Sequence, residues 1–384
     1  MLHLRRNGRQ RNKKVQEICR ARAIASAVLL LCALLLYAFA RLIPGIFFVV
    51  YTPFSRAVSG FLAFLFSFAP ISVVEFLLYG LILFFIGHLI FSVVVTCVRA
   101  ERFWFLLRWV VHLLLAVSVI VSSFTLLWGL NYFAPPLERK LSLDVRERPQ
   151  ETLIAATEWL VSIVNEESGN IRLKEDGSMD GGGFDALAKK IPVAYKALAA
   201  KNPEFRGGSS APVKKVTFWQ PFVYSGIAGV YSPFTGESNV NPKTIDAYLP
   251  FYMAHEMAHR YGYAAENDAN FVAFLVCMES PDAEIRYSGA LSAFFYCVNK
   301  IYDSDERTRL WDSMPQSVRC DIIASRELMK SLSLDKGLLD AMTGFMSGAN
   351  DAYLQTMGQY DGIAGYGRMA DLVIAQYIKT GGSP

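Results

Sequence analysis

Residues 76–98 read FLLYGLILFFIGHLIFSVVVTCV and contain no charged side chain. About 20 consecutive apolar residues are enough for a helix to cross the hydrocarbon core of a bilayer. Because lipid offers the backbone no hydrogen-bond partner, a run of this kind is expected to be helical. This stretch therefore predicts a membrane-spanning helix, and it indicates that part of the chain does not fold in water.

Two similar runs lie on either side of this stretch. Residues 23–40 read AIASAVLLLCALLLYAFA, and a longer run, WVVHLLLAVSVIVSSFTLLWGLNYF, begins at Trp109. Each approaches or exceeds the length that a membrane crossing requires. Together the runs predict an α-helical membrane anchor of three transmembrane helices, at about 23–43, 75–98 and 109–129.

Residues 57–74 (AVSGFLAFLFSFAPISVV) leave two alternatives open, because this run is apolar but contains Pro70. It is either a fourth transmembrane helix or an interfacial or re-entrant segment. Cytoplasmic loops are enriched in Lys and Arg, which distinguishes the two. Residues 1–22 carry eight basic side chains, and the connection 99–108 carries three. Three crossings place both on the cytoplasmic side, so we predict an interfacial or re-entrant segment at 46–70.

The charge distribution divides the chain near Leu130. Residues 1–129 contain 13 Lys and Arg against 3 Asp and Glu, whereas residues 130–384 contain 25 against 31. The net charge of +4 is thus an average over two unlike halves, and no nucleic-acid partner is expected from it. We predict a basic cytoplasmic N-terminus (1–22), a transmembrane region (23–129) and an extracytoplasmic domain (130–384). The lipid bilayer is then a partner, and the location is a bacterial cytoplasmic membrane.

Helical periodicity dominates the globular half, for example in ETLIAATEWLVSIVNEE (151–167) and FDALAKKIPVAYKALAAK (184–201). Residues 216–234, VTFWQPFVYSGIAGVYSPF, are rich in aromatic and β-branched residues and in Gly, as strands and turns are. These patterns predict a mostly α domain of the α+β class with a small sheet.

One motif in this half carries chemistry, namely His255-Glu256-Met257-Ala258-His259. On a helix the two His lie at i and i+4, so both imidazoles project from one face and can share a Zn²⁺ ion. Glu256 is then placed to act as general base on a zinc-activated water. The globular half has no other His. The alternative is a helix whose two His make only ordinary surface or core contacts.

A catalytic zinc needs a third protein ligand, which should be a carboxylate here because no His remains. Glu266 and Asp268 are the near candidates. Residues 266–270 (ENDAN) resemble the ExxA[ND] element of gluzincin peptidases, which HtpX-type proteases and ImmA/IrrE-type peptidases share. The resemblance implies that Glu266 binds zinc and that Asn270 orients a ligand. Only six residues separate His259 from Glu266, much fewer than in HtpX-type enzymes, which keeps Asp268 as the alternative ligand.

Five segments extend the resemblance over nearly the whole chain: WGLNY (128–132), GIAGVYSPFTGESNVN (226–241), AHEMAHRYGYAAENDANFVAFLVC (254–277), RYSG (286–289) and DGIAGYGRMADL (361–372). They are similar to one family of bacterial polytopic membrane proteins, a domain-of-unknown-function family with an N-terminal cluster of spans and a C-terminal HExxH domain. The resemblance implies a zincin-like fold and a zinc-dependent peptidase, and it implies no particular substrate.

Peptide hydrolysis also develops an oxyanion, which needs a hydrogen-bond donor besides zinc. Tyr366 is our first candidate for this donor and Tyr287 the second; each is alternatively a buried hydroxyl that ties a loop to the helices. Residues 229–241 precede the HExxH motif, as the substrate-aligning edge strand does in many zinc peptidases, and an extended peptide can add to such an edge. Glu237 and Asn239 in this segment either position the substrate or close a turn.

These observations predict a membrane-anchored zinc-dependent metallohydrolase with one Zn²⁺ per chain, acting as a peptidase on an amide bond of a peptide or protein substrate. His255, His259 and Glu266 would hold the metal. The alternative is a non-catalytic zinc-stabilised binding or sensor domain on a membrane anchor, with the fourth metal position filled. A structural site has no use for Glu256 and more commonly uses Cys, so the sequence favours the enzyme.

Overall fold

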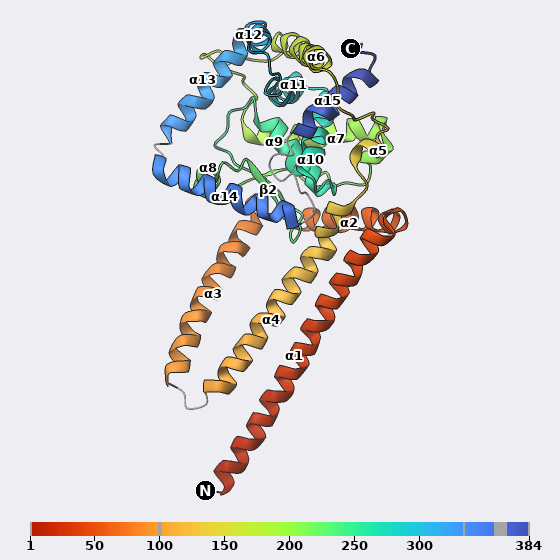
Figure 1. The fold of residues 1–384 in the computed structure, drawn as a ribbon. Helices are drawn as coiled ribbons and strands as arrows, with labels where there is room; N and C mark the ends of the chain where they lie inside the picture. The colour runs from red at the N-terminus through yellow and green to blue at the C-terminus, as the bar shows by residue number, and fades with distance from the viewer. Residues whose placement is uncertain (1, 99–101, 333–334, 357–366, 383–384) are drawn as a thin grey trace.

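The computed structural model describes residues 2–98, 102–332, 335–356 and 367–382. Its first part contains four helices that are long and apolar enough to cross a membrane. These are α1 (Leu2–Leu42), α2 (Pro44–Phe66), α3 (Val73–Val98) and α4 (Arg102–Leu127). Helices α1, α3 and α4 extend together away from the globular part, whereas α2 lies across them at the junction with it (Figure 1).

The three long runs predicted as membrane spans correspond to α1, α3 and α4. The segment for which the sequence left two alternatives is one helix, α2, and it runs crosswise to the other three (Figure 1). Pro70 interrupts no helix, because it lies in the turn between α2 and α3. Residue Ile43 alone separates α1 from α2, and Pro44 occupies the first turn of α2, where its missing N–H leaves no bond unmade.

Helix α2 has two unlike faces. The residues buried against the rest of the protein recur at helical spacing: Phe48, Tyr51, Ser55, Arg56, Ser59 and Ala63. The opposite face exposes large apolar side chains, each at least 63% exposed: Ile46, Val49, Val50, Phe61 and Phe64. An uncovered apolar face of this size marks a surface that meets a partner or a membrane.

The globular part is mostly helical, and six helical elements form its first portion, before strand β2. They are η1 (Gly129–Phe133), α5 (Leu137–Lys140), α6 (Gln150–Ser168), α7 (Phe184–Lys201), η2 (Pro203–Phe205) and α8 (Trp219–Ser225). The helices after the sheet are α9 (Leu249–Arg260), α10 (Glu266–Met278), α11 (Ala283–Val298), α12 (Ser304–Asp312), α13 (Gln316–Ser331), α14 (Lys336–Thr356) and α15 (Gly367–Lys379).

A three-stranded sheet lies beside α9. Its strands are β1 (Lys214–Lys215), β2 (Gly229–Tyr231) and β3 (Ser238–Val240), in the order β1-β3-β2. Strand β3 is central, parallel to β1 and antiparallel to β2. The small sheet expected from the sequence is therefore present, but residues 219–225 of the strand-like stretch form helix α8 instead. This helix ends at Gly226, whose φ of 69° is a conformation that Gly adopts readily.

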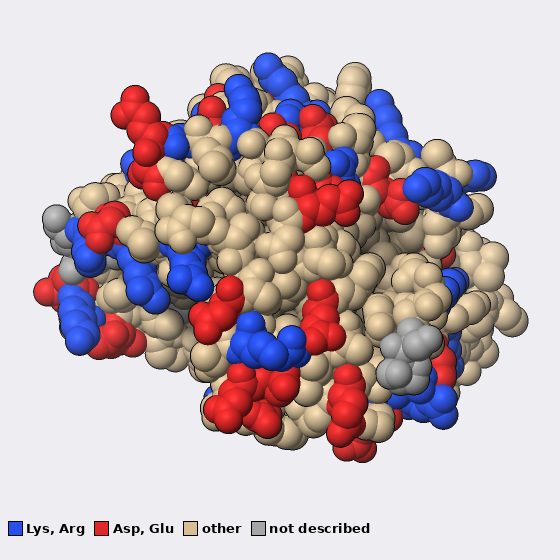
Figure 2. All heavy atoms as spheres, turned by 90° about the horizontal axis from the view of Figure 1, so that it is seen from above, with Lys and Arg blue, Asp and Glu red and all other residues tan. Residues whose placement is uncertain are grey.

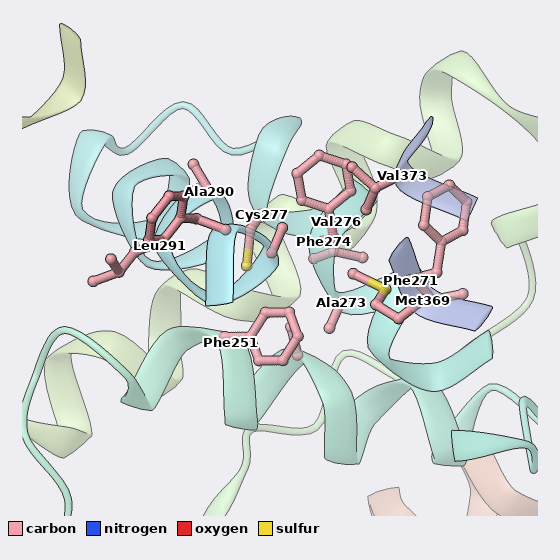
Figure 3. Close-up of a cluster of buried hydrophobic side chains, with 14 of the residues drawn as sticks. Phe251, Phe271, Ala273, Phe274, Val276, Cys277, Ala290, Leu291, Met369 and Val373 are labelled. Atoms are coloured by element: carbon pink, nitrogen blue, oxygen red, sulfur yellow. The ribbon is translucent and has the colours of Figure 1, made fainter. Parts of the chain in front are cut away.

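The core of the globular part lies between α9, α10, α11 and α15 (Figure 3). Helix α10 is buried almost all round, which fits its near-continuous apolar sequence after the first turn. Figure 3 shows side chains from four helices in this cluster: Phe251 from α9, Phe271, Phe274 and Cys277 from α10, Ala290 and Leu291 from α11, and Met369 and Val373 from α15. Helix α9, which carries the HExxH motif, thus packs into this core through residues such as Phe251.

The side of the molecule that faces away from α1, α3 and α4 carries charges of both signs (Figure 2). Seen from that side, acidic and basic side chains are interspersed over the surface (Figure 2). The exposed side chains of the long helices are instead mostly Leu, Ile, Val and Phe. An apolar zone formed by α1, α3 and α4 therefore lies between the globular part and the basic N-terminal residues of α1 (Figure 1).

Candidate metal centre

The HExxH motif lies on α9, and Glu266 is the first residue of α10. Helix α9 ends at Arg260, and the chain turns at Gly262 with a φ of 87°. A residue with a side chain is strained in this left-handed conformation, so Gly suits the turn. The turn folds α10 back against α9 and brings the first residue of α10 to the two His.

His255, His259 and Glu266 form a cluster whose ligand atoms lie within 4.8 Å of one another. His255 Nε2 is 3.3 Å from Glu266 Oε2, and His259 Nε2 is 3.7 Å from Glu266 Oε1. Atoms that bind a zinc ion tetrahedrally at about 2.0–2.1 Å lie about 3.3 Å from one another. The two imidazoles and the carboxylate therefore have the chemistry and the spacing of a zinc site.

The protonation of His259 supports this reading. Its Nδ1 is 2.7 Å from the carbonyl oxygen of Tyr263, and a carbonyl can only accept a hydrogen bond. Nδ1 therefore carries the proton, and in the neutral ring Nε2 presents a lone pair. That lone pair faces the carboxylate of Glu266, which is an acceptor as well. A cation between them satisfies both groups, and a backbone carbonyl on Nδ1 is a common support of metal-binding His.

Burial shapes the electrostatics of the cluster. Burial lowers the pKa of His259 to about 4, which keeps its ring neutral. Burial alone would raise the pKa of the Glu266 carboxyl, but the hydrogen bond from His255 and the two imidazoles outweigh it and lower that pKa to about 2. Burial would also lower the pKa of the His255 ring, but its hydrogen bond to Glu266 and the nearby carboxylates outweigh burial and raise that pKa. Metal binding at this cluster would therefore displace a proton from His255.

Glu256 lies beside the cluster with its side chain buried. Its Oε2 has no hydrogen-bond partner among the described residues, and burial raises the pKa of its carboxyl to about 8. Strand β2 passes directly over it, because a Cβ added to Gly229 would lie 2.7 Å from Glu256 Oε1. A buried carboxyl with one free oxygen in this position is suited to exchange a proton with a reacting group.

The two carboxylates left open by the sequence lie in different surroundings. Asp268 is not part of the cluster; its neighbours are the backbone of Leu137 and the side chains of Glu138 and Arg368, and burial raises its pKa to about 6. Glu266 is thus the carboxylate that the structure places with the His pair. Asn270 is buried on α10 close enough to His255 to contribute to raising the pKa of its ring, a position from which it can orient that ring.

Glu237 and Asn239 take structural positions. The Glu237 carboxylate accepts hydrogen bonds from the backbone N–H groups of Val73 (3.0 Å) and Val74 (2.8 Å), and it pairs with Lys214 at 2.5 Å. It therefore caps the start of α3 and is not available to a substrate. Asn239 is fully buried in the central strand β3. The edge strand of the predicted segment is β2, which contains neither residue.

Of the two Tyr candidates for the oxyanion donor, the structure describes only Tyr287. Tyr366 lies outside the described residues. Tyr287 is fully buried on α11, and its hydroxyl donates a hydrogen bond of 2.7 Å to Asp321. Asp321 also accepts a hydrogen bond from the backbone N–H of Met179. Tyr287 therefore ties a loop to two helices, the second of the two roles that the sequence left open for it.

Sequence reasoning missed the aromatic residues that support the cluster. Trp128 follows the last residue of α4, and its ring is 5.6 Å from the His259 ring in an edge-to-face arrangement. The same ring is 4.9 Å from that of Tyr231 on β2, whose hydroxyl is 2.8 Å from Ser59 Oγ on α2. The available signal was WGLNY (128–132), which is one of the five segments similar to the family and lies next to a predicted span. No role had been assigned to its Trp.

Arg56 was missed as well. It is buried on α2 and donates to the carbonyl oxygen of Tyr261 (2.8 Å), one residue after α9, and to the hydroxyl of Tyr263 (3.1 Å). It also donates to the backbone and carboxylate of Glu204. A single charged residue in an otherwise apolar run is a signal of such a role, and Arg56 is the only one between Arg41 and Glu75.

Comparison with known proteins gives one result. A family model described as "Protein of unknown function (DUF3810)" matches residues 51–374. No curated protein and no solved structure matches the chain. The matched region begins within α2 and includes the whole His–Glu cluster, together with Trp128 and β2. The chain therefore belongs to the DUF3810 family of proteins of unknown function.

Proposed function

We propose that this protein is a membrane-anchored, zinc-dependent metallohydrolase that acts as a peptidase. The observation that supports it most strongly is the convergence of His255, His259 and Glu266 on one point, with the buried carboxyl of Glu256 beside them. Two imidazoles and a carboxylate are the ligand set of several catalytic zinc sites, which keep one position open. In this proposal α9 supplies the two His ligands and the general base, and α10 supplies the third ligand, as the corresponding helices do in zincins.

Each residue then has a defined role. His255 and His259 bind the metal through Nε2, and Glu266 binds it through its carboxylate. A bound zinc ion supplies Lewis acidity to the attacking water and to the substrate carbonyl. Glu256 accepts a proton from that water and delivers it to the amine that leaves, so that the C–N bond breaks as a C–O bond forms and the products are a carboxylate and an amine.

Strand β2 is the proposed site of the substrate backbone. Next to β2, the Ala228 carbonyl accepts a hydrogen bond from the N–H of Asn241 and the Ser232 N–H donates one to the carbonyl of Glu237, so Val230 between them also directs its backbone groups toward β3. In an antiparallel pair the alternate residues direct their N–H and C=O groups to the other side, and here these are Gly229 and Tyr231. An extended peptide that pairs with them adds a strand next to Glu256.

The membrane topology that fits these features has three crossings. Helices α1, α3 and α4 cross, α2 lies in the membrane surface, and the globular part stands outside the cytoplasm. The basic residues of 1–22 and of the α3–α4 connection then share the cytoplasmic side. The crosswise position of α2 supports this topology over one with four crossings (Figure 1).

The test uses the full-length protein in lipid vesicles, loaded with zinc. The probe is a library of mixed-sequence peptides, half of which carry a membrane-spanning helix, with products identified by mass spectrometry. We expect cleavage by the native protein, and loss of cleavage with about one zinc per chain retained in Glu256→Gln. Glu158→Gln, an exposed carboxylate paired with Arg309, is the control. Zinc binding without any Glu256-dependent cleavage contradicts the peptidase and supports a non-catalytic zinc-stabilised domain.

A further inference from the structure

The candidate site is built directly on the membrane helices. The ring of Trp128, one residue beyond α4, contacts His259. The turn between β2 and β3 rests on α2, because a Cβ at Gly236 would collide with the backbone of Ser59 and Ala63. Both contacts are direct: the Trp128 ring is 5.6 Å from the His259 ring, and the Gly236 turn lies against the α2 backbone. The metal ligands therefore lie immediately above the end of a transmembrane helix.

Two carboxylates fasten the sheet to the start of α3. Glu237, next to β3, caps the first turn of α3, as described above. In the opposite direction, Glu75 on α3 accepts hydrogen bonds from the backbone N–H groups of Thr217 (2.7 Å) and Phe218 (3.0 Å), which follow β1. Strand β2 pairs with β3, so these contacts hold β2 in place relative to both α2 and α3.

The outer face of α2 fixes the position of the bilayer. This face is apolar and uncovered, and it lies at the end of the bundle from which α1, α3 and α4 extend (Figure 1). Continuity with these helices identifies its partner as lipid. A helix is about 10 Å in diameter, so the cluster lies on the order of one helix diameter above the acyl chains. An extended chain covers that distance in about three residues.

From these observations, and resting on the function proposed above, we propose that the substrate is a polypeptide anchored in the same membrane. It is cleaved in the extended segment within about ten residues of the end of its transmembrane helix. A chain that leaves the bilayer reaches β2 after a few residues, and its anchor raises its effective concentration at the site. A soluble chain has to approach the lipid surface to pair with the same edge.

The test compares three probes with the full-length protein in vesicles. The first is a single transmembrane helix followed by a 40-residue mixed-sequence segment, the second is that segment without the helix, and the third has a 20-residue helical spacer after the transmembrane helix. We expect Glu256-dependent cuts within about ten residues of the membrane in the first probe and at least tenfold slower cutting of the second. In the third probe we expect the mixed-sequence segment to be spared.

Three results are decisive. Equal Glu256-dependent cleavage of the soluble segment, or cuts spread along all 40 residues, overturns the juxtamembrane substrate but leaves the peptidase in place. Absence of Glu256-dependent cleavage of every probe overturns the peptidase and this proposal together.

Binding gives a readout that does not need turnover. A photo-reactive amino acid in place of Val230, on the exposed side of β2, should cross-link the anchored probe near its helix end in Glu256→Gln. Cross-linking at remote positions contradicts the proposal.

Discussion

At the scale of single residues, the site depends on which group each side chain faces. His259 directs Nδ1 to a backbone carbonyl and Nε2 to Glu266, so one ring is both oriented and available as a ligand. Asp268 is two residues from Glu266 on the same helix, yet it faces α5 and Arg368. A separation of two residues on a helix places side chains on different faces. This difference decides between two carboxylates that the sequence left as alternatives.

A comparison of these two carboxylates tests the assignment. Glu266→Ala should lose bound zinc, because it removes the only anionic ligand, whereas Asp268→Ala should retain about one zinc per chain. Zinc is measured by mass spectrometry on the full-length protein purified in detergent. Loss of zinc in Asp268→Ala with retention in Glu266→Ala would show that the ligand set is wrong.

Gly229 makes a second prediction at this scale. A methyl group there would lie 2.6 Å from the Asn239 carbonyl oxygen and 2.7 Å from Glu256 Cγ, so the strand or the carboxylate has to move. We expect Gly229→Ala to retain zinc but to lose at least 100-fold in peptide cleavage, since small displacements of a catalytic group have effects of this size. Gly344→Ala, where a Cβ meets nothing within 4 Å, is the control. Native activity in Gly229→Ala would remove the close approach of β2 from the mechanism.

At the scale of elements, α2 is the unexpected component. Its inner face carries Arg56 and Ser59 to the end of α9 and to β2, and its outer face is apolar. The HExxH helix, the Glu266 turn and the small sheet follow from local spacing and could be predicted from the sequence. The contact between Arg56 and Tyr261 spans 205 residues of the chain. A lone Arg in an apolar run indicates that it has a partner, but a partner 205 residues away cannot be identified from a local pattern, which is why the contacts of α2 could not be predicted.

The stability contributed by α2 can be tested at Arg56. Arg56→Met leaves the Glu204 carboxylate with Lys140 and the Tyr263 hydroxyl, and it leaves the Tyr261 carbonyl without this donor. Removing this donor leaves acceptors in the interior without a partner, which costs about 1–3 kcal/mol, so we expect the midpoint of thermal unfolding in detergent to fall by several degrees. Arg41→Met, at an exposed Arg that bonds only Tyr37 among its described hydrogen bonds, is the control. Equal midpoints for both variants would contradict the role of Arg56.

At the scale of the whole molecule, the membrane part and the globular part form one packing unit. The charge change near Leu130 marks where the long apolar runs end and charged residues become frequent in the sequence. It does not mark where the fold divides, because α2, α3 and Trp128 all contact the globular part across it. The family match agrees with this, since it begins within α2 at residue 51 and includes Arg56, α3 and Trp128 together with the globular part.

A truncation tests this unity. A fragment of residues 130–384 lacks Arg56, the α3 cap partner of Glu237 and the Trp128 contact to His259. Buried groups that lose their partners are strongly destabilising, so we expect the fragment to be insoluble or to be digested rapidly by trypsin. The full-length protein in detergent should resist the same treatment. A soluble, protease-resistant fragment that binds one zinc would show that the globular part folds alone.

The most direct test of the central claim is X-ray absorption spectroscopy at the zinc edge on the full-length, zinc-loaded protein. We predict a first shell of nitrogen and oxygen atoms at about 2.0–2.1 Å with the multiple-scattering signature of two imidazoles. His259→Ala should lose the metal or retain a shell with a single imidazole. A shell containing sulfur, or an imidazole signature unchanged in His259→Ala, would contradict the metal centre on which the proposed function rests.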